Sequence, residues 1–145
     1  MIKRPIAILI ALSLLAPLAY AKPPVFATSK GAIRGFDAVA YFMDGKPVKG
    51  NTQYSAEWNG AKWFFATPEN RGRFAVDPSN YAPQYGGYCA YAVANGYTAS
   101  TDPDAWSIVE GKLYLNYSLG VREKWQEDIP GNIASANKNW PGVLR

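Results

Sequence analysis

The sequence has no histidine and only 1 cysteine, Cys89, among its 145 residues. Without histidine, neither a Ser-His-Asp triad nor a Cys-His dyad can form within the chain. A single thiol also excludes an intrachain disulfide and leaves too few sulfur and imidazole ligands for a Cys/His zinc site. These absences exclude much of the commonest hydrolytic and structural-metal chemistry, and we expect no bound cofactor.

What is present begins with a targeting pattern in the first 21 residues. Lys3 and Arg4 give a positively charged start, and residues 6–18 are almost wholly apolar. Ala19 and Ala21 place small side chains where a signal peptidase reads the chain. The apolar run is too short for a comfortable membrane span. We therefore expect cleavage after Ala21 and a periplasmic or secreted product without stable insertion in the membrane.

The charged residues, 18% of the sequence, carry little information about partners. Removing Lys3 and Arg4 with the signal peptide leaves 13 basic side chains against 11 acidic ones. The basic side chains are scattered, and no run of them can follow a phosphate backbone. The sequence therefore predicts a mixed, solvated surface and no binding to nucleic acid.

Two hairpins are the clearest local predictions. In residues 52–66, Asn59-Gly60 is the preferred pair of a type I′ turn, because both turn residues need positive φ. Aromatic residues flank this pair on both sides. A second hairpin is expected over residues 105–117, with its turn at 110–111 and alternating leucines in its second strand.

Other segments predict one strand and several short helices. Residues 37–43 form a short apolar run between turn residues, which favours a buried strand. Thr67 and Pro68 suit the cap and the first position of a helix that ends at Asp77. Further short helices are expected after the glycine pair at 86–87, after Ser118 and from Pro130 onward.

These elements together predict an α+β fold, in which a small antiparallel sheet built from two hairpins is packed with short helices. With 48% apolar residues, the chain can bury one small core. The expected organisation is a signal peptide at 1–21, a flexible leader at 22–30 and a single domain at 31–145.

Four short motifs follow one another along the chain: DAVAYF at 37–42, WFFA at 63–66, DPSNY at 77–81 and YGGYCA at 85–90. With the segments at 105–117 and 139–141, they resemble the YHS-domain family in its small secreted bacterial form, a group that includes members described as selenoproteins. The resemblance covers nearly all of residues 31–141. It implies a hairpin-plus-helix module of the kind found in copper transporters and beside oxygenase subunits.

The resemblance also bears on metal binding. Metal-linked YHS domains carry three cysteines, and the matching positions here are Ala40, Ala66 and Asn70. Because all three thiols are missing, the resemblance implies the fold more than the metal chemistry. Cys89 is the only residue that can correspond to the selenocysteine of the selenoprotein members.

Two interpretations of Cys89 remain open. After the turn at Gly86-Gly87 it is expected in the first turn of a helix, where free N–H groups stabilise a thiolate. It can equally be a small buried hydrophobe between Tyr88 and Tyr91.

Tyrosines are numerous around this segment, and they can line a pocket or pack in the core. The candidate ligand-binding residues are Tyr41, Tyr85, Gly86, Gly87, Tyr88, Cys89 and Tyr91.

Two acidic positions have a structural and a functional interpretation. Asp37 can serve as an acid/base group or oxygen ligand, or it can hydrogen-bond the backbone beside Gly35. Asp102-Pro103-Asp104 can form an acidic cation loop or an ordinary turn.

The leading hypothesis is an extracytoplasmic binding module rather than an enzyme, with a small ligand or a periplasmic protein as its partner. One alternative is a thiol redox protein or sensor that uses Cys89. The other is a weak soft-metal (copper) carrier in which Cys89 is the sole strong ligand.

Overall fold

A computed structural model of the chain describes residues 1–3, 5–11 and 21–145. The first two of these segments contain no helix or strand. Residues 4 and 12–20 of the predicted signal peptide, which include Ala19 ahead of its cleavage point, lie outside the described residues. Within the described ranges, no helix has the length and apolar character needed to cross a bilayer.

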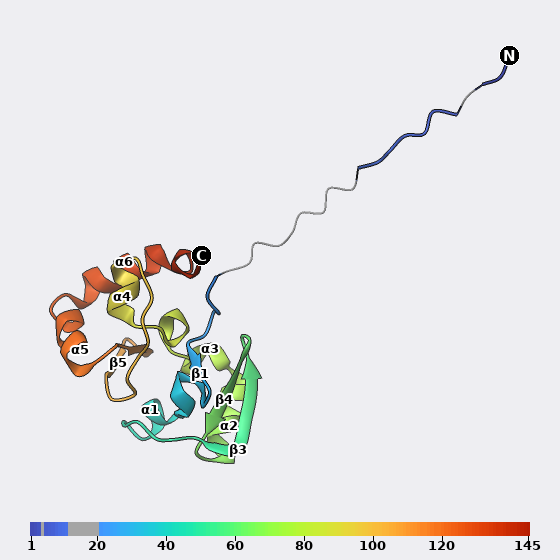
Figure 1. Cartoon of the computed structure of the whole chain (residues 1–145). Coiled ribbons are helices and arrows are strands. Elements are labelled where there is room, and N and C mark those ends of the chain that lie inside the picture. Colours follow the sequence, from blue (N-terminus) through green and yellow to red (C-terminus); the bar gives the residue numbers. More distant parts are fainter. Residues whose placement is uncertain (4, 12–20) are drawn as a thin grey trace.

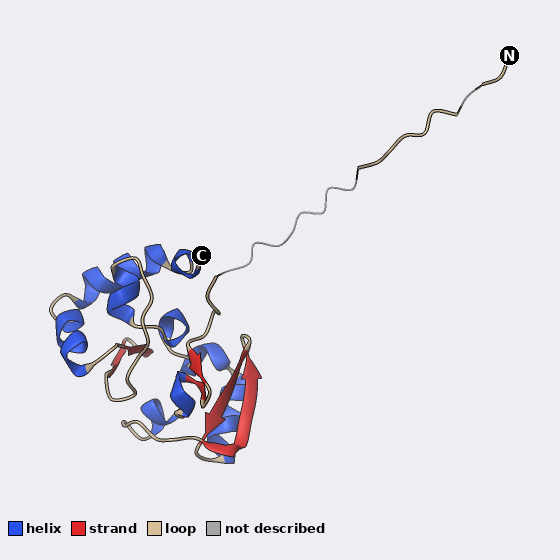
Figure 2. Cartoon of the chain, viewed as in Figure 1, coloured by secondary structure: helices blue, strands red, loops and turns tan. Residues whose placement is uncertain are grey.

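Short helices and three hairpins make up the fold (Figures 1 and 2). The strands are β1 (Ala27–Thr28), β2 (Gly31–Ala32), β3 (Asn51–Trp58), β4 (Ala61–Phe65), β5 (Trp106–Val109) and β6 (Lys112–Leu115). The α-helices are α1 (Ala40–Met43), α2 (Pro68–Val76), α3 (Pro78–Tyr81), α4 (Ala90–Ala94), α5 (Leu119–Gln126) and α6 (Ile129–Asn139). Single 3-10 turns are η1 (Ile33–Gly35), η2 (Gln84–Gly87) and η3 (Gly142–Leu144).

The α+β class is confirmed, and both predicted hairpins form. Asn59 has φ 51° and Gly60 has φ 78°, while Glu110 and Gly111 have φ 50° and 75°, as type I′ turns require. The two hairpins do not join into one sheet, however. In the described part of the chain β1-β2, β3-β4 and β5-β6 are separate two-stranded antiparallel sheets.

The prediction of a strand at residues 37–43 is wrong. The second half of this segment is helix α1, and the Asp37 side chain bonds the start of that helix: its Oδ1 accepts the N–H groups of Val39 at 2.9 Å and Ala40 at 3.1 Å. The run is apolar because it is buried, and a buried helical turn has the same composition as a buried strand.

The longer helices begin where cap chemistry predicts them. Thr67 Oγ1 accepts the N–H of Asn70 at 3.1 Å at the start of α2, and Ser118 Oγ accepts the N–H of Val121 at 3.1 Å before α5. Helix α4 starts later than expected, so that Cys89 is its N-cap rather than a first-turn residue.

The buried apolar side chains form two clusters. The first core holds Trp63, Phe65 and Phe74. The ring centroid of Phe74 lies 5.2 Å from that of Trp63 and 5.0 Å from that of Phe65. The second core holds Tyr85, Tyr88, Tyr114 and Trp125 with residues of α4 and α6. In Figure 1, the elements α2, β3 and β4 that surround the first core lie at the lower right, and α4, α5 and α6 lie at the upper left.

Strand β6 contributes to both cores. Leu113 and Leu115 belong to the first core, whereas Tyr114, between them on the opposite face, belongs to the second. All three are at most 3% exposed. The strand is therefore a shared wall whose alternating side chains fill the interior on both sides.

Residues 22–30, which were expected to be a flexible leader, are held against the rest of the chain. The N–H of Lys22 donates to the carbonyl of Leu144 at 3.0 Å, and the N–H of Phe26 donates to the carbonyl of Gly86 at 2.9 Å. Val25 between them is only 1% exposed. This segment therefore links the two ends of the described domain.

Candidate functional site

The structure does not gather the predicted tyrosine residues into one pocket. Tyr41 lies in the first core and donates its hydroxyl to the carbonyl of Pro103 at 2.9 Å. Tyr85 and Tyr88 lie in the second core, with hydroxyls bonded to Asn137 Oδ1 and the Pro23 carbonyl, each at 2.9 Å. Each of these rings is at most 7% exposed. Their polar ends are already occupied by the protein itself.

The neighbouring glycines serve a sharp turn. Tyr85, Gly86 and Gly87 have φ of 58°, 63° and 86°, and a Cβ on Gly86 would overlap the carbonyl of Pro24. This close approach packs the N-terminal segment against η2, and a Cβ on Gly87 would lie 2.5 Å from the Ile33 side chain, so packing accounts for both glycines.

Cys89 is fully buried, and its thiol contacts polar groups of the segment after β6. The Sγ atom lies 3.5 Å from Asn116 Oδ1 and accepts the N–H of Tyr117 at 3.3 Å. Burial raises the pKa of this thiol, although the N–H groups of Ala92, Tyr117 and Tyr91 act in the opposite direction. This setting agrees with the buried interpretation and disfavours a thiolate.

A small hollow of about 290 Å³ lies over Cys89, with walls that include Tyr91, Tyr97 and Tyr117. Cys89 and Tyr91 are thus the two predicted residues that share a cavity. In the described part of the chain, no group of three Cys, Asp or Glu side chains is arranged to hold a metal ion.

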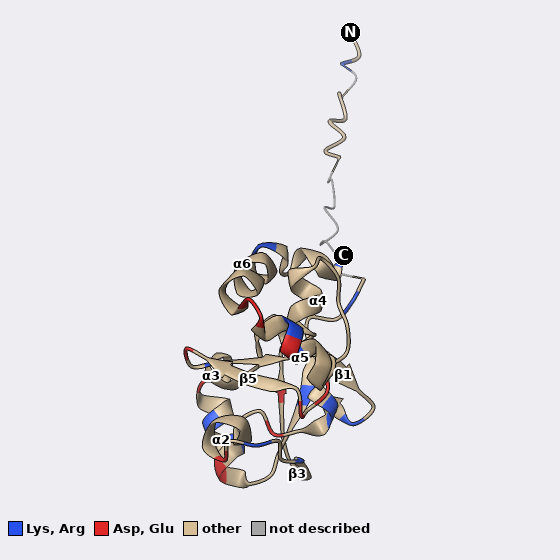
Figure 3. Cartoon of the chain, turned by 90° about the vertical axis from the view of Figure 1, so that its left-hand side faces the viewer, with Lys and Arg blue, Asp and Glu red and all other residues tan. Residues whose placement is uncertain are grey.

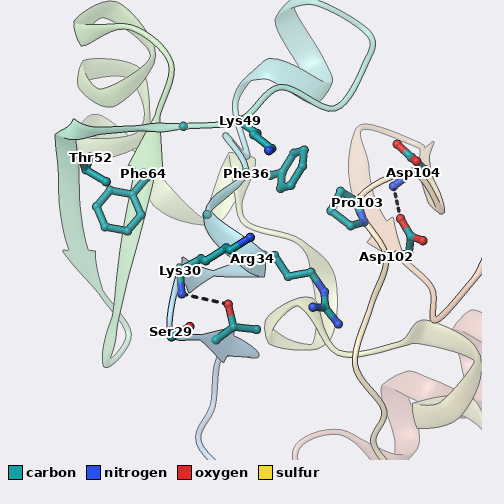
Figure 4. A pocket seen from close by; sticks show the side chains of 13 residues that line it. Ser29, Lys30, Arg34, Phe36, Lys49, Thr52, Phe64, Asp102, Pro103 and Asp104 are labelled. Carbon is teal, nitrogen blue, oxygen red and sulfur yellow. Dashed lines mark hydrogen bonds between the residues drawn. The ribbon is translucent and has the colours of Figure 1, made fainter.

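A larger cleft of about 760 Å³ lies elsewhere, between η1, the loop before β3 and the loop after α4 (Figure 4). Three basic side chains line it, and they are Lys30, Arg34 and Lys49. The rings of Phe36 and Phe64 form apolar wall, and residues 102–104 close the far side.

Arg34 reaches this cleft from a left-handed turn. Ile33, Arg34 and Gly35 have φ of 44°, 61° and 80° in succession. A left-handed conformation costs roughly 1–2 kcal/mol for each residue with a side chain, and it is an outlier for β-branched Ile33. Such strain persists where the surroundings impose it, and it concentrates at ligand-binding sites.

The Arg34 side chain is held at its stem and free at its tip. Nε donates to the carbonyl of Thr101 at 2.9 Å, and the guanidinium carbon lies 5.6 Å from the centre of the Phe26 ring. The two terminal nitrogens have no hydrogen-bond partner among the described residues. They are therefore available to a ligand.

Glycines let the backbone come close to Phe64, whose ring is part of the cleft wall. A Cβ on Gly31 would lie 2.6 Å from the Phe64 ring, and one on Gly50 would lie 2.6 Å from the Phe64 Cβ. Real Cβ atoms do not approach neighbours so closely, so a larger residue at either position would displace this wall.

Residues 102–104 form a turn, which is one of the two interpretations that the sequence left open for them. Asp102 Oδ1 accepts the N–H of Asp104 at 2.9 Å. Neither carboxylate forms an ion pair within 4.0 Å with Lys30, Arg34 or Lys49 in the structure as far as it is described. Figure 3 shows basic and acidic positions near one another beside β1.

Comparison with known proteins identifies part of this architecture. Residues 39–85 match the family model of the YHS domain. This segment is a YHS domain. It runs from α1 through the β3-β4 hairpin to the start of η2, so the resemblance to the YHS domain is confirmed for this segment. No curated protein and no solved structure matches the chain.

The cleft lies at the border of the YHS domain. Lys49 and Phe64 belong to the domain, whereas Lys30 and Arg34 precede it and Asp102 follows it. The sequence did not predict this site, because its residues are spread over more than half of the folded chain. The only local signals were the glycines at 31, 35 and 50, which are typical of unusual backbone turns.

Proposed function

We propose that the protein binds a small anionic ligand through the cleft formed by its YHS domain and the flanking loops. The observation that carries this proposal is the convergence of Lys30, Arg34 and Lys49 on one cavity, without a paired carboxylate in the described residues. Three like charges repel one another, and an anion between them relieves that repulsion.

The chemistry of the cleft fits a carboxylate or phosphate group attached to an apolar body. The free edge of the Arg34 guanidinium can donate two parallel hydrogen bonds to such a group. Lys30 and Lys49 are exposed and add charge without fixed geometry. Phe36 and Phe64 offer apolar surface beside the charges.

Calorimetric titration with N-acetylphenylalanine tests the proposal, since this probe has one carboxylate, one ring and no positive charge. Arg34→Gln is expected to weaken its binding about tenfold or more, as for loss of a charge-assisted hydrogen bond. Lys49→Gln is expected to weaken it about threefold, and added salt to weaken it further.

Lys138→Gln is the matched control, because Lys138 is an exposed residue of α6 outside the cleft and the change removes the same charge. If Lys138→Gln weakened binding as much as Lys49→Gln, the effect would come from the net charge of the protein and not from the cleft. Absence of binding by the unaltered protein would overturn the proposal.

The two functions centred on Cys89 gain no support from this geometry. Redox chemistry and soft-metal binding both need an accessible thiolate, and the thiol is buried with a raised pKa.

Our proposal also places the protein outside the cytoplasm, on the pattern of its first 21 residues. Determination of the N-terminus of the exported protein is expected to give Lys22. A cytoplasmic protein that keeps its first residues would contradict this location.

A further inference from the structure

The cleft presents two charged walls of opposite sign. Asp102 and Asp104 line the same cavity as Lys30, Arg34 and Lys49. Figure 4 shows Lys30 and Lys49 on one side of the Phe36 ring, with Pro103 and the two carboxylates on the other. The Phe36 ring therefore separates the two lysines from the carboxylates, while Arg34 extends toward the side of residues 101–103, where its Nε is bonded to the carbonyl of Thr101.

Local bonds keep the two walls from neutralising each other. Arg34 is held by the carbonyl of Thr101, and Asp102 is held by the N–H of Asp104. Two unlike charges in contact near a protein surface attract by several kcal/mol before solvation costs are counted. The absence of any such pair across the cleft, in the described residues, leaves both walls available to a ligand.

Free hydrogen-bonding capacity remains on the acidic wall. Asp102 uses Oδ1 in its turn, while its Oδ2 and the Asp104 carboxylate have no partner among the described residues. Burial, and to a lesser degree the charges of Asp104 and Asp102, raise the pKa of the nearby Tyr41 hydroxyl. The negative field of this wall is therefore felt by a neighbouring group.

We infer that the cleft recognises a short peptide with both termini free, and this inference rests on the proposed function. The terminal carboxylate faces Lys30, Arg34 and Lys49, and the terminal ammonium faces Asp102 and Asp104. A side chain of the peptide packs on Phe36 between them.

The size and charge of the cavity both suit such a ligand. Its volume of about 760 Å³ lies within the usual range for small-molecule sites, and it exceeds what one amino acid fills. A zwitterion compensates both walls at once, whereas a simple anion leaves the carboxylates uncompensated and close to its own charge.

Three tripeptides with the sequence Ala-Phe-Ala test the inference by calorimetry on the full protein: the free peptide, its N-acetylated form and its C-terminal amide. For the unaltered protein, N-acetylation is expected to weaken binding about fivefold to tenfold, as for loss of a charge-assisted contact. The C-terminal amide is expected to bind at least as weakly as the N-acetylated peptide.

The double variant Asp102→Asn, Asp104→Asn identifies the acidic wall. Asparagine keeps a side-chain oxygen for the N–H of residue 104, so the turn can be retained. The free and acetylated peptides are expected to bind this variant equally well. The acetylated peptide is expected to bind the variant no more weakly than it binds the unaltered protein. Glu110→Gln with Glu123→Gln is the control, because it removes two exposed carboxylates outside the cleft.

The outcomes separate this inference from the proposed function. If free and acetylated peptides bind the unaltered protein equally, the acidic wall is not used, and only the inference is overturned. The same holds if N-acetylphenylalanine binds and no peptide does. If no probe with a free carboxylate binds, or if the amide binds as well as the free peptide, anion binding itself fails.

Discussion

The region of the YHS domain and the C-terminal half of the chain differ in whether their buried polar atoms have hydrogen-bond partners. Two residues before the YHS domain, Asp37 is fully buried, and its Oδ2 accepts the N–H of Ala66 at 2.8 Å and the amide of Asn70 at 2.9 Å, both within the domain. Its other oxygen accepts the N–H groups of Val39 and Ala40 at the start of α1. In the C-terminal half, the buried Asn116 Nδ2 and Trp125 Nε1 have no partner in the described structure.

This difference shows where the fold depends on polar geometry. Asp37 joins the start of α1, the end of β4 and the start of α2 through one carboxylate. Removing it leaves several buried donors without an acceptor. In the C-terminal half, removal of an unpartnered donor relieves a cost instead.

The halves differ in their titratable groups as well. Burial raises the pKa values of Tyr85, Tyr88, Cys89 and Tyr114, all in or beside the second core. In the first core this holds for Tyr41. Alkaline pH is therefore expected to act mainly on the second core.

The largest effect is expected from Phe74→Ala in the first core. Phe74 is fully buried and contacts the rings of Trp58, Trp63 and Phe65. Loss of the ring should lower the free energy of unfolding by about 3–5 kcal/mol, measured by urea denaturation. A loss below about 1 kcal/mol would show that this cluster is not the main support of the YHS domain.

Asp37→Ala should cost roughly 3 kcal/mol, because it leaves the N–H of Ala66 and the amide of Asn70 unsatisfied. The measurement is the same denaturation experiment, with Asp44→Ala as an exposed control. Equal costs for the two variants would remove the contrast in polar geometry between the halves.

Stability should fall as pH rises above about 9. The thiol and the tyrosines ionise near their ordinary pKa values of 9.0 and 10.0 when unfolded, but at higher pH when folded. Their stabilising contribution is present below the unfolded pKa and is lost as pH rises toward the folded one.

The thiol should account for part of this loss between neutral pH and pH 10, because burial raises its pKa in the folded state. Denaturation of Cys89→Ala across this range measures it, with Tyr97→Phe as an exposed control. An unchanged pH profile for Cys89→Ala would mean that the thiol is not protected by the fold.

Trp125→Phe should have the smallest effect, within about 1 kcal/mol of the unaltered protein. The variant loses part of a buried ring, and it also removes an N–H that has no partner in the described structure. A loss above about 3 kcal/mol would show that this N–H is satisfied in solution and would weaken the comparison.

Local chemistry predicted the hairpins and most helix starts. Asn59-Gly60, Thr67 and Ser118 act through residues within a few positions, so their roles are visible in the sequence. The strand prediction at 37–43 failed because a buried helical turn has the same apolar composition as a buried strand. Two of the bonds that hold Asp37 in place also come from residues 29 and 33 positions away.

The site was largely invisible to sequence reasoning for the same reason. The predicted ligand-binding site assumed that residues close together in the sequence share a cavity. Instead, the hydroxyls of Tyr85 and Tyr88 bond to partners 52 and 65 positions away. Lys30 and Asp102 look unrelated until the fold places them in one cleft. Cys89 was left open between two interpretations, and only its burial distinguishes them.

The two-faced strand β6 has a consequence for modularity. Leu113 and Leu115 complete the core of the YHS domain, although they lie well beyond residue 85, where the family match ends. A graft of residues 39–85 into another protein would therefore arrive with an open apolar face. Its new host would have to supply a strand in place of β6, so the portable unit of this protein is longer than its family signature.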